Sequence, residues 1–227
     1  MDNKELRKFI QKVWTEKAKE KSIFDYAFEK DYQQVKEQLM KGTNIDFKLD
    51  NKHGITLLHI ACKDCDNILF EICKQFKANP NIPDRSGQTP IFLSVENKDM
   101  RYVKELVDMG ADIKWNDNNG SSVLYWGIYS SSLEVLEYLR SLGAKLVTTN
   151  VIGRTPLIKA AYLCKYDVMK WLLGFEEVKD TIFMGDKNER NVIHSSCWGP
   201  KGGRKGKLMN SIILDDSPEC LEYLLDM

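Results

Sequence analysis

Residues 84–112 read DRSGQTPIFLSVENKDMRYVKELVDMGAD, and the rest of the chain repeats this pattern. A glycine recurs at intervals of 33 residues, at Gly54, Gly87, Gly120 and Gly153. Each of these glycines is followed by a similar tetrapeptide: TLLH at 56–59, TPIF at 89–92, SVLY at 122–125 and TPLI at 155–158. A constant period of this length predicts a solenoid in which each unit buries its apolar face against the next unit.

Each unit carries the local signals of a tight turn and two short helices. The segment from Asp84 to Gly87 predicts the turn, because glycine adopts a positive φ without strain. Thr89 and its equivalents can cap the helix that follows, and Pro90 suits that helix's first turn, where a missing N–H costs nothing. A second apolar helix then ends at Gly110, where a left-handed C-cap is expected.

These units resemble the ankyrin repeat, whose pattern is a D-x-x-G turn, T-P-L-H-x-A-A, a second helix and then G-A-D-x-N. The resemblance covers residues 22–227 and implies an all-α ankyrin-repeat solenoid of helix-turn-helix pairs with β-hairpin or turn fingers. The repeats are expected at about 22–46, 50–82, 84–115, 117–148, 150–180 and 186–227.

Residues 1–21 precede the first repeat and predict an amphipathic helix. Its apolar face is formed by Leu6, Phe9, Ile10, Val13 and Trp14. We interpret this helix as an N-terminal cap, because a terminal repeat needs a cover for its exposed face. The alternative is a helix whose apolar face docks on a partner.

The end of the sequence matches the second helix of a repeat, and no polar capping repeat follows Met227. Leu221, Leu224 or Leu225 would then be exposed at this end. We expect that the chain is a fragment of a longer array or that something else covers this end.

Composition excludes several classes of protein. Lys plus Arg and Asp plus Glu are both 33, so the net charge is zero, which argues against a binder of polyanions over the whole molecule. No apolar run approaches the roughly 18 to 20 residues that a membrane span needs. The N-terminus has no apolar leader, and the six cysteines lack the spacing of a small disulfide scaffold. We therefore predict a cytoplasmic protein, with the nucleus as the alternative.

The last repeat carries an insertion at residues 198–217, which opens with a glycine-rich basic loop. The cations of this loop are Lys201, Arg204, Lys205 and Lys207. A P-loop needs G-x-x-x-x-G-K-[ST] after a strand, and here Leu208 follows Gly206 and Lys207, so the motif fails. We interpret the loop as a solvated insertion, and binding of nucleic acid or another acidic partner is the alternative.

His59, Cys62 and Cys65 have the spacing of a metal site, but the resemblance gives them structural positions. His59 is the histidine of T-P-L-H, whose ring would bond to the threonine hydroxyl and the turn. Cys62 occupies a small-residue position, and Cys65 occupies the position of a glycine between the helices. The three histidines suggest no Ser/His/Asp set. We expect no catalytic residue, no metal, no cofactor and no small-molecule substrate.

The resemblance implies that a protein partner binds the concave face, which is made of turn tips and the ends of the first helices. Aromatic residues and arginine at these positions are favoured at interface hot spots. The candidate partner-binding residues are Trp115, Tyr129, Arg154, Tyr162, Leu163, Arg190 and Trp198. Alternatively, the aromatic rings pack on neighbouring repeats.

We therefore expect a non-enzymatic interaction or scaffold module for a protein partner, without membrane contact. One alternative is an adaptor or targeting region of a larger multidomain protein, such as an enzyme, whose other domains lie beyond Met227. Another is nucleic-acid binding through residues 198–207. A native mass near 26 kDa would remove the first alternative, and binding that is insensitive to salt would remove the second.

Overall fold

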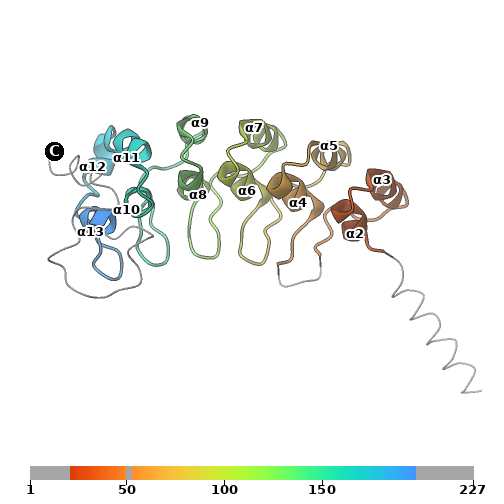
Figure 1. The fold of residues 1–227 in the computed structure, drawn as a ribbon, viewed down its shortest axis with the longest axis horizontal. Coiled ribbons are helices and arrows are strands. Elements are labelled where there is room, and N and C mark those ends of the chain that lie inside the picture. The colour runs from red at the N-terminus through yellow and green to blue at the C-terminus, as the bar shows by residue number, and fades with distance from the viewer. Residues whose placement is uncertain (1–20, 50–52, 198–227) are drawn as a thin grey trace, which may run out of the picture.

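The computed structural model describes residues 21–49 and 53–197 as a row of stacked helix pairs (Figure 1). The predicted N-terminal helix, the insertion at 198–217 and the last predicted helix lie outside the described residues. The described helices are α2 (Ile23–Phe28), α3 (Tyr32–Met40), α4 (Leu57–Asp64), α5 (Asn67–Gln75), α6 (Pro90–Glu96), α7 (Met100–Asp108), α8 (Val123–Ser130), α9 (Leu133–Ser141), α10 (Pro156–Tyr162), α11 (Tyr166–Leu173), α12 (Glu176–Lys179) and α13 (Val192–Cys197).

The helices form two layers (Figure 1). The inner layer contains α4, α6, α8, α10 and α13, and each of these helices contacts the next. The outer layer contains α5, α7, α9 and α11, each packed on the inner helix that precedes it. The row bends gently, with the outer helices on its convex side and the turns projecting from the other, concave side (Figure 1). This arrangement confirms the predicted all-α solenoid.

Short polar side chains close the turns that precede the inner helices. Asp84 Oδ1 accepts hydrogen bonds from the backbone N–H of Ser86 at 2.8 Å and of Gln88 at 2.9 Å. Equivalent bonds are made by Asp117, Asn150 and Asp186. This geometry explains why aspartate or asparagine recurs at this position, since both side chains readily bond to backbone two residues on.

Backbone hydrogen bonds join neighbouring turns. The bonds run from Arg85 N to His53 O (2.8 Å), Asn118 N to Ser86 O (3.0 Å), Val151 N to Asn119 O (2.8 Å) and Lys187 N to Ile152 O (2.9 Å). They bring the turns so close that a Cβ atom at Gly87 would lie 2.6 Å from the backbone nitrogen of Asn118. The recurring glycine is therefore required both by its φ of 80° and by this close approach.

A continuous hydrophobic core lies between the two layers. Phe24, Phe70, Phe92, Leu124 and Leu136 are among its fully buried side chains, and they come from α2, α5, α6, α8 and α9 in turn. Each such side chain contributes about 1.5–3 kcal/mol of burial free energy. Because the contacts join neighbouring repeats, stability is close to a sum of repeat and junction terms.

One predicted cap has no hydrogen bond. Thr155 Oγ1 accepts from the backbone N–H of Ile158 at 3.1 Å, as expected for the residue before α10. Thr89 precedes α6 in the same position, but its buried hydroxyl has no hydrogen-bond partner.

The structure also adds a short helix, α12, in the longer turn after α11, which the repeat pattern does not predict. Within the described part of the chain, no helix has the length and apolar character needed to cross a membrane.

Candidate functional site

Two of the predicted partner-binding tyrosines lie at the ends of successive inner helices. Tyr129 is in the last turn of α8, and Tyr162 is the last residue of α10. Both side chains are partly exposed. The 33-residue period thus places them at equivalent positions of neighbouring repeats, as predicted.

Lys159 of α10 lies against two tyrosine rings of α8. Its Nζ atom is 3.9 Å from the ring centroid of Tyr129 and 5.4 Å from that of Tyr125. The ammonium also donates a hydrogen bond to the hydroxyl of Tyr129. Lys159 is buried, with 7% of its surface exposed, so these cation–π contacts act where water is largely excluded.

Arg154 lies at the turn before α10 and is fixed on two sides. Its Nε atom forms an ion pair with Asp186 Oδ2 at 3.2 Å, and the Asp186 side chain is fully buried. Its guanidinium carbon lies 5.3 Å from the ring centroid of Tyr162. The side chain keeps 20% of its surface exposed, so a partner can reach part of it.

We call Tyr125, Tyr129, Arg154, Lys159 and Tyr162 the tyrosine–lysine cluster. Burial, together with the nearby Arg154 cation, lowers the pKa of Lys159 to about 8. Burial raises the pKa of Tyr125 to about 12. Among the described residues, no carboxylate forms an ion pair with Lys159, so the cluster keeps an ammonium without a compensating anion.

Trp126 extends this surface along α8. Its ring centroid is 5.2 Å from that of Tyr129, and its indole N–H donates to Asp117 Oδ2 at 2.9 Å. The sequence prediction missed Tyr125, Trp126 and Lys159. A helical signal exists for all three, because Trp126 and Lys159 each precede a predicted tyrosine by three residues and Tyr125 precedes Tyr129 by four. Both spacings place two side chains on the same helix face.

The other predicted residues have different surroundings. The indole N–H of Trp115 donates to the carbonyl of Gly87 at 2.9 Å, which ties its ring to the preceding turn. Leu163 is partly buried and packs against the hydrophobic core. Arg190 donates its backbone N–H to Asp186 at 3.1 Å in the turn before α13. The remaining predicted residues, Trp198, Lys201, Arg204, Lys205 and Lys207, lie outside the described residues.

His59 has the structural role that its position predicts. Its Nδ1 atom accepts from the backbone N–H of Thr56 at 3.1 Å, and its Nε2 atom lies 3.0 Å from the carbonyl oxygen of Gln88. Both ring nitrogens are thereby used. Burial raises the pKa of Cys62 to about 12 and also raises that of Cys73, so neither thiol is readily ionised. No group of three or more His, Cys, Asp or Glu side chains in residues 21–49 and 53–197 is placed to hold a metal ion.

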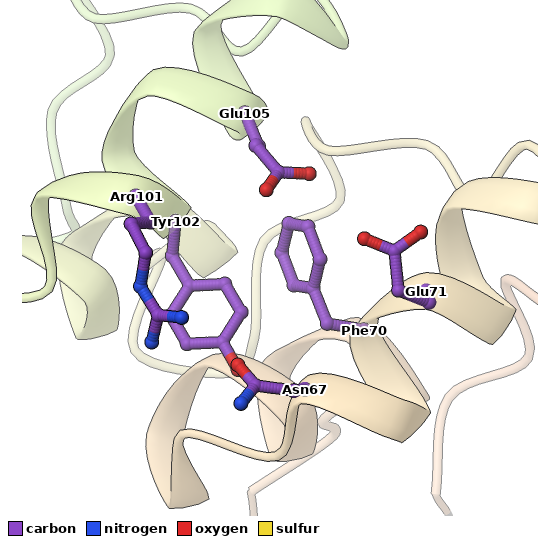
Figure 2. A pocket seen from close by; sticks show the side chains of 6 residues that line it. All are labelled: Asn67, Phe70, Glu71, Arg101, Tyr102 and Glu105. Atoms are coloured by element: carbon purple, nitrogen blue, oxygen red, sulfur yellow. The ribbon is translucent and has the colours of Figure 1, made fainter.

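A pocket of about 220 Å³ lies between α5 and α7, on the outer layer (Figure 2). The rings of Phe70 and Tyr102 pack in it with centroids 4.5 Å apart, and the Tyr102 hydroxyl donates to Asn67 Oδ1 at 2.7 Å. At its rim, Glu105 pairs with Lys74 at 2.7 Å, and Arg101 pairs with Asp99 at 2.9 Å. Because Phe70, Tyr102, Arg101 and Glu105 already have partners within the chain, we interpret the pocket as a seam between repeats.

Comparison with known proteins agrees with the geometry. The family described as "Ankyrin repeats (3 copies)" matches residues 64–150. An ankyrin repeat protein of Rickettsia bellii is 30% identical over 118 residues, which cover 49% of this chain and 33% of that protein. The ankyrin repeat protein OPG189 of Variola virus is 36% identical over 110 residues, which cover 47% of this chain and 19% of that protein.

A third relative is named as an activator of a GTPase. The ADP-ribosylation factor GTPase-activating protein AGD4 of Arabidopsis thaliana is 38% identical over 71 residues, which cover 31% of this chain and 9% of that protein. The chain thus spans a third or less of the length of these relatives. The period of 33 residues, the stacked helix pairs and the family match together identify the repeats as ankyrin repeats, in an all-α ankyrin-repeat solenoid.

Proposed function

We propose that this chain is a non-enzymatic module that binds a protein partner on its concave face, through α8 and α10. Ankyrin repeats imply a protein–protein interaction module. The observation that carries the choice of surface is the pair Tyr129 and Tyr162, which are partly exposed at equivalent positions of successive inner helices. Each ring has a cation against it, from Lys159 and Arg154 respectively.

The contacts of these rings within the chain favour binding. A tyrosine that is already held in place loses little conformational entropy when a partner covers it. Tyr129 is held by Trp126 and Lys159, and Tyr162 is held by Arg154. The two interpretations of the aromatic residues, packing and binding, are therefore compatible: one side of each ring packs within the chain, and the exposed side is available to the partner.

Site-specific photo-crosslinking in extracts of the source organism tests this surface. The photoreactive residue p-benzoylphenylalanine is placed at Tyr129, at Tyr162 or, as a matched control, at Tyr138, a partly exposed tyrosine of the outer helix α9. We expect one protein to be crosslinked from positions 129 and 162 and not from position 138. Crosslinking of that protein only from position 138 would show that the interface lies on the outer helices and would contradict the proposed surface.

A pull-down after nuclease treatment provides the second measurement. The variant with both Tyr129→Ala and Tyr162→Ala, checked for folding by circular dichroism, is expected to lose the crosslinked protein, while Tyr138→Ala retains it. If the double variant retains the protein as well as wild type does, the tyrosines serve packing alone.

The remaining expectations stay predictions. Nucleic-acid binding through residues 198–207 concerns a segment outside the described residues, and a binding constant that falls steeply with salt would support it. An adaptor role in a larger protein is tested by the native mass. A cytoplasmic location is compatible with the free thiols of Cys62 and Cys73 and is tested by imaging the tagged protein.

A further inference from the structure

The charges of the tyrosine–lysine cluster do not balance. Arg154 has a carboxylate partner in Asp186, but Lys159 forms no ion pair with any described residue. Lys159 is instead held by the hydroxyl and ring of Tyr129 and by the ring of Tyr125. At neutral pH Lys159 therefore keeps a positive charge that has no ion-pair partner among the described residues.

The carboxylates around the cluster do not supply this counterion. Asp186 is occupied by Arg154 and by the backbone of its own turn. Asp117 accepts hydrogen bonds from its own turn and from the indole of Trp126. Glu96, at the end of α6, is exposed and lies near enough to contribute, after burial, to the raised pKa of Tyr129. It forms no ion pair with Lys159.

Arg154 has unused hydrogen-bonding capacity. Its Nε atom donates to Asp186, whereas neither terminal guanidinium nitrogen donates a hydrogen bond to any described residue. A guanidinium presents its donors as a rigid planar fork, which matches the two oxygens of a carboxylate. The ion pair with Asp186 and the contact with Tyr162 hold this fork in one orientation before any partner arrives.

We propose that the protein partner places an aspartate or glutamate side chain on the tyrosine–lysine cluster, where Arg154 and Lys159 bind its carboxylate. This inference rests on the proposed function, because it assigns a chemical class to the partner residue that contacts the same surface. Tyr129 and Tyr162 would flank the acidic side chain and exclude water from the ion pair. A basic residue of the partner at this position would be rejected, so the cluster would also contribute to specificity.

The charge count favours a carboxylate over a phosphate or a nucleic acid. One carboxylate neutralises the single uncompensated charge, whereas a phosphate group carries about −1.5 to −2 and would leave excess negative charge in a poorly solvated site. A nucleic acid presents a series of phosphates and needs several surface cations. Lys159 is buried, which suits one inserted side chain better than a nucleic-acid backbone.

Selection from a library of random 12-residue peptides tests the proposal whatever the identity of the partner. The wild-type chain is the bait, and the affinities of selected peptides are measured by fluorescence anisotropy. We expect the peptides to share Asp or Glu at one aligned position, and replacement of that residue by Asn or Gln to weaken binding at least tenfold. The Lys159→Met chain should bind the selected acidic peptides more weakly than the wild-type chain does, to a similar extent. It should bind the Asn- or Gln-substituted peptides no more weakly than the wild-type chain does.

Lys104→Met is the matched control, because Lys104 also lies over a tyrosine ring, at 5.9 Å from the centroid of Tyr138, but on the outer helix α7. This variant should bind the peptides as wild type does. If Lys159→Met does not fold, the Asp-to-Asn or Glu-to-Gln changes in the peptides still test the proposal on the unaltered chain.

The outcomes separate the two proposals. Peptides that lack a shared acidic residue, yet are lost in the Tyr129→Ala and Tyr162→Ala double variant, would overturn the acidic-residue inference and support the concave surface. Peptides that bind the double variant as tightly as wild type, or a failure to select any peptide, would contradict both proposals. If a phosphoserine peptide binds more than tenfold tighter than its glutamate counterpart, the cluster binds a phosphate group in preference to a carboxylate, and the carboxylate inference is wrong.

Discussion

The imidazole of His59 donates a hydrogen bond from Nε2 to the carbonyl oxygen of Gln88, at 3.0 Å, and so joins one repeat to the next. The direction of this bond follows from the other side of the ring, where Nδ1 accepts from the backbone N–H of Thr56 at 3.1 Å. A protonated ring would direct two N–H groups at each other on the Nδ1 side. The junction between these repeats therefore requires a neutral histidine.

This requirement predicts a loss of stability in mild acid. Burial lowers the pKa of His59 below its usual value of 6.5, so the unfolded chain binds a proton at a pH where the folded chain does not. The stabilisation is complete above pH 6.5 and decreases as the pH falls through the folded-state pKa. Urea unfolding at pH 7.5 and 5.5 should show a smaller pH dependence in His59→Ala than in wild type.

The same variant should be less stable at pH 7.5 by about 2–3 kcal/mol, since it removes a buried side chain and three hydrogen-bonding contacts. His194→Ala is the control, because His194 is exposed and, among the residues that the structure describes, bonds only to Asn191 in its own turn. If His59→Ala keeps the full pH dependence of wild type, another group governs the response to acid.

A pair of threonines provides a matched test of capping. Thr56 Oγ1 lies 2.8 Å from His59 Nδ1, whereas the hydroxyl of Thr89 is buried without a partner. Phe92 occupies the place of the histidine, so Thr89 lacks the ring nitrogen that Thr56 contacts. Unlike Thr155, Thr89 also does not accept from the backbone N–H three residues on. Thr56→Val should therefore cost about 1–2 kcal/mol, whereas Thr89→Val should be neutral or stabilising.

Thermal unfolding of the two valine variants measures this difference. Valine matches the shape of threonine, so packing changes little and the hydroxyl is the main variable. A large destabilisation by Thr89→Val, equal to that of Thr56→Val, would show that the Thr89 hydroxyl has a partner in solution.

A comparison of Gly87 with Gly110 distinguishes the cost of backbone strain from the cost of close packing between turns. Gly87 has a φ of 80° and lies so near the next turn that a Cβ would be 2.6 Å from the backbone nitrogen of Asn118. Gly110 has a φ of 91°, and a Cβ there would have no neighbour within 4 Å. Gly110→Ala should cost about 1 kcal/mol for the positive φ alone.

Gly87→Ala should cost clearly more, about 2–4 kcal/mol, because it also forces two turns apart and breaks the bond from Asn118 N to Ser86 O. Urea unfolding of both variants gives the comparison, and amide hydrogen exchange at Asn118 reports the broken bond directly. Equal destabilisation of the two variants would mean that the close approach contributes nothing.

The sequence predicts the fold well because its decisive features are local. The Asp84-to-Gly87 turn, the proline at the start of α6 and the glycine after α7 each determine a short segment, and the 33-residue period repeats them. The missing cap at Thr89 is not predictable in this way, because Thr155 also lacks a histidine three positions on and is nevertheless capped by the backbone N–H of Ile158. The short helix α12 occupies a junction where the period lengthens, so no equivalent repeat indicates its structure.

The candidate site is less predictable because its contacts join different repeats. Tyr129 and Tyr162 follow from the repeat register, but Lys159 gains its role from rings on the preceding helix. From the sequence alone, a lysine at a variable position of the repeat is expected to be a solvated charge, since the repeat pattern does not indicate that it is buried. Trp115 shows the opposite case, because an aromatic residue near a turn tip suggests binding, while its indole bonds to the neighbouring turn.

Lys159 should make the chain more stable as the pH rises in the alkaline range. Its pKa is lowered from 10.5 to about 8 by burial and by Arg154, so between these values the unfolded chain binds a proton that the folded chain has lost. Stability therefore rises with pH from about 8 to 10.5, and below pH 8 the protonated side chain opposes folding. Lys159→Met should remove this rise and increase the Tm at pH 7 by a few degrees, because an apolar side chain replaces a buried ammonium.

Calorimetric or circular-dichroism melts of wild type, Lys159→Met and Lys104→Met at pH 7, 8.5 and 10 measure the effect. Differences from wild type isolate the lysine from other groups that titrate in this range, and Lys104→Met, which alters an exposed residue, should follow the wild-type profile. The same proton couples to binding: a carboxylate on Lys159 favours its charged form, so an acidic peptide should bind more weakly at pH 9.5 than at pH 7.5. A Lys159→Met variant whose Tm tracks wild type at all three pH values would show that the ammonium is solvated and stays protonated throughout.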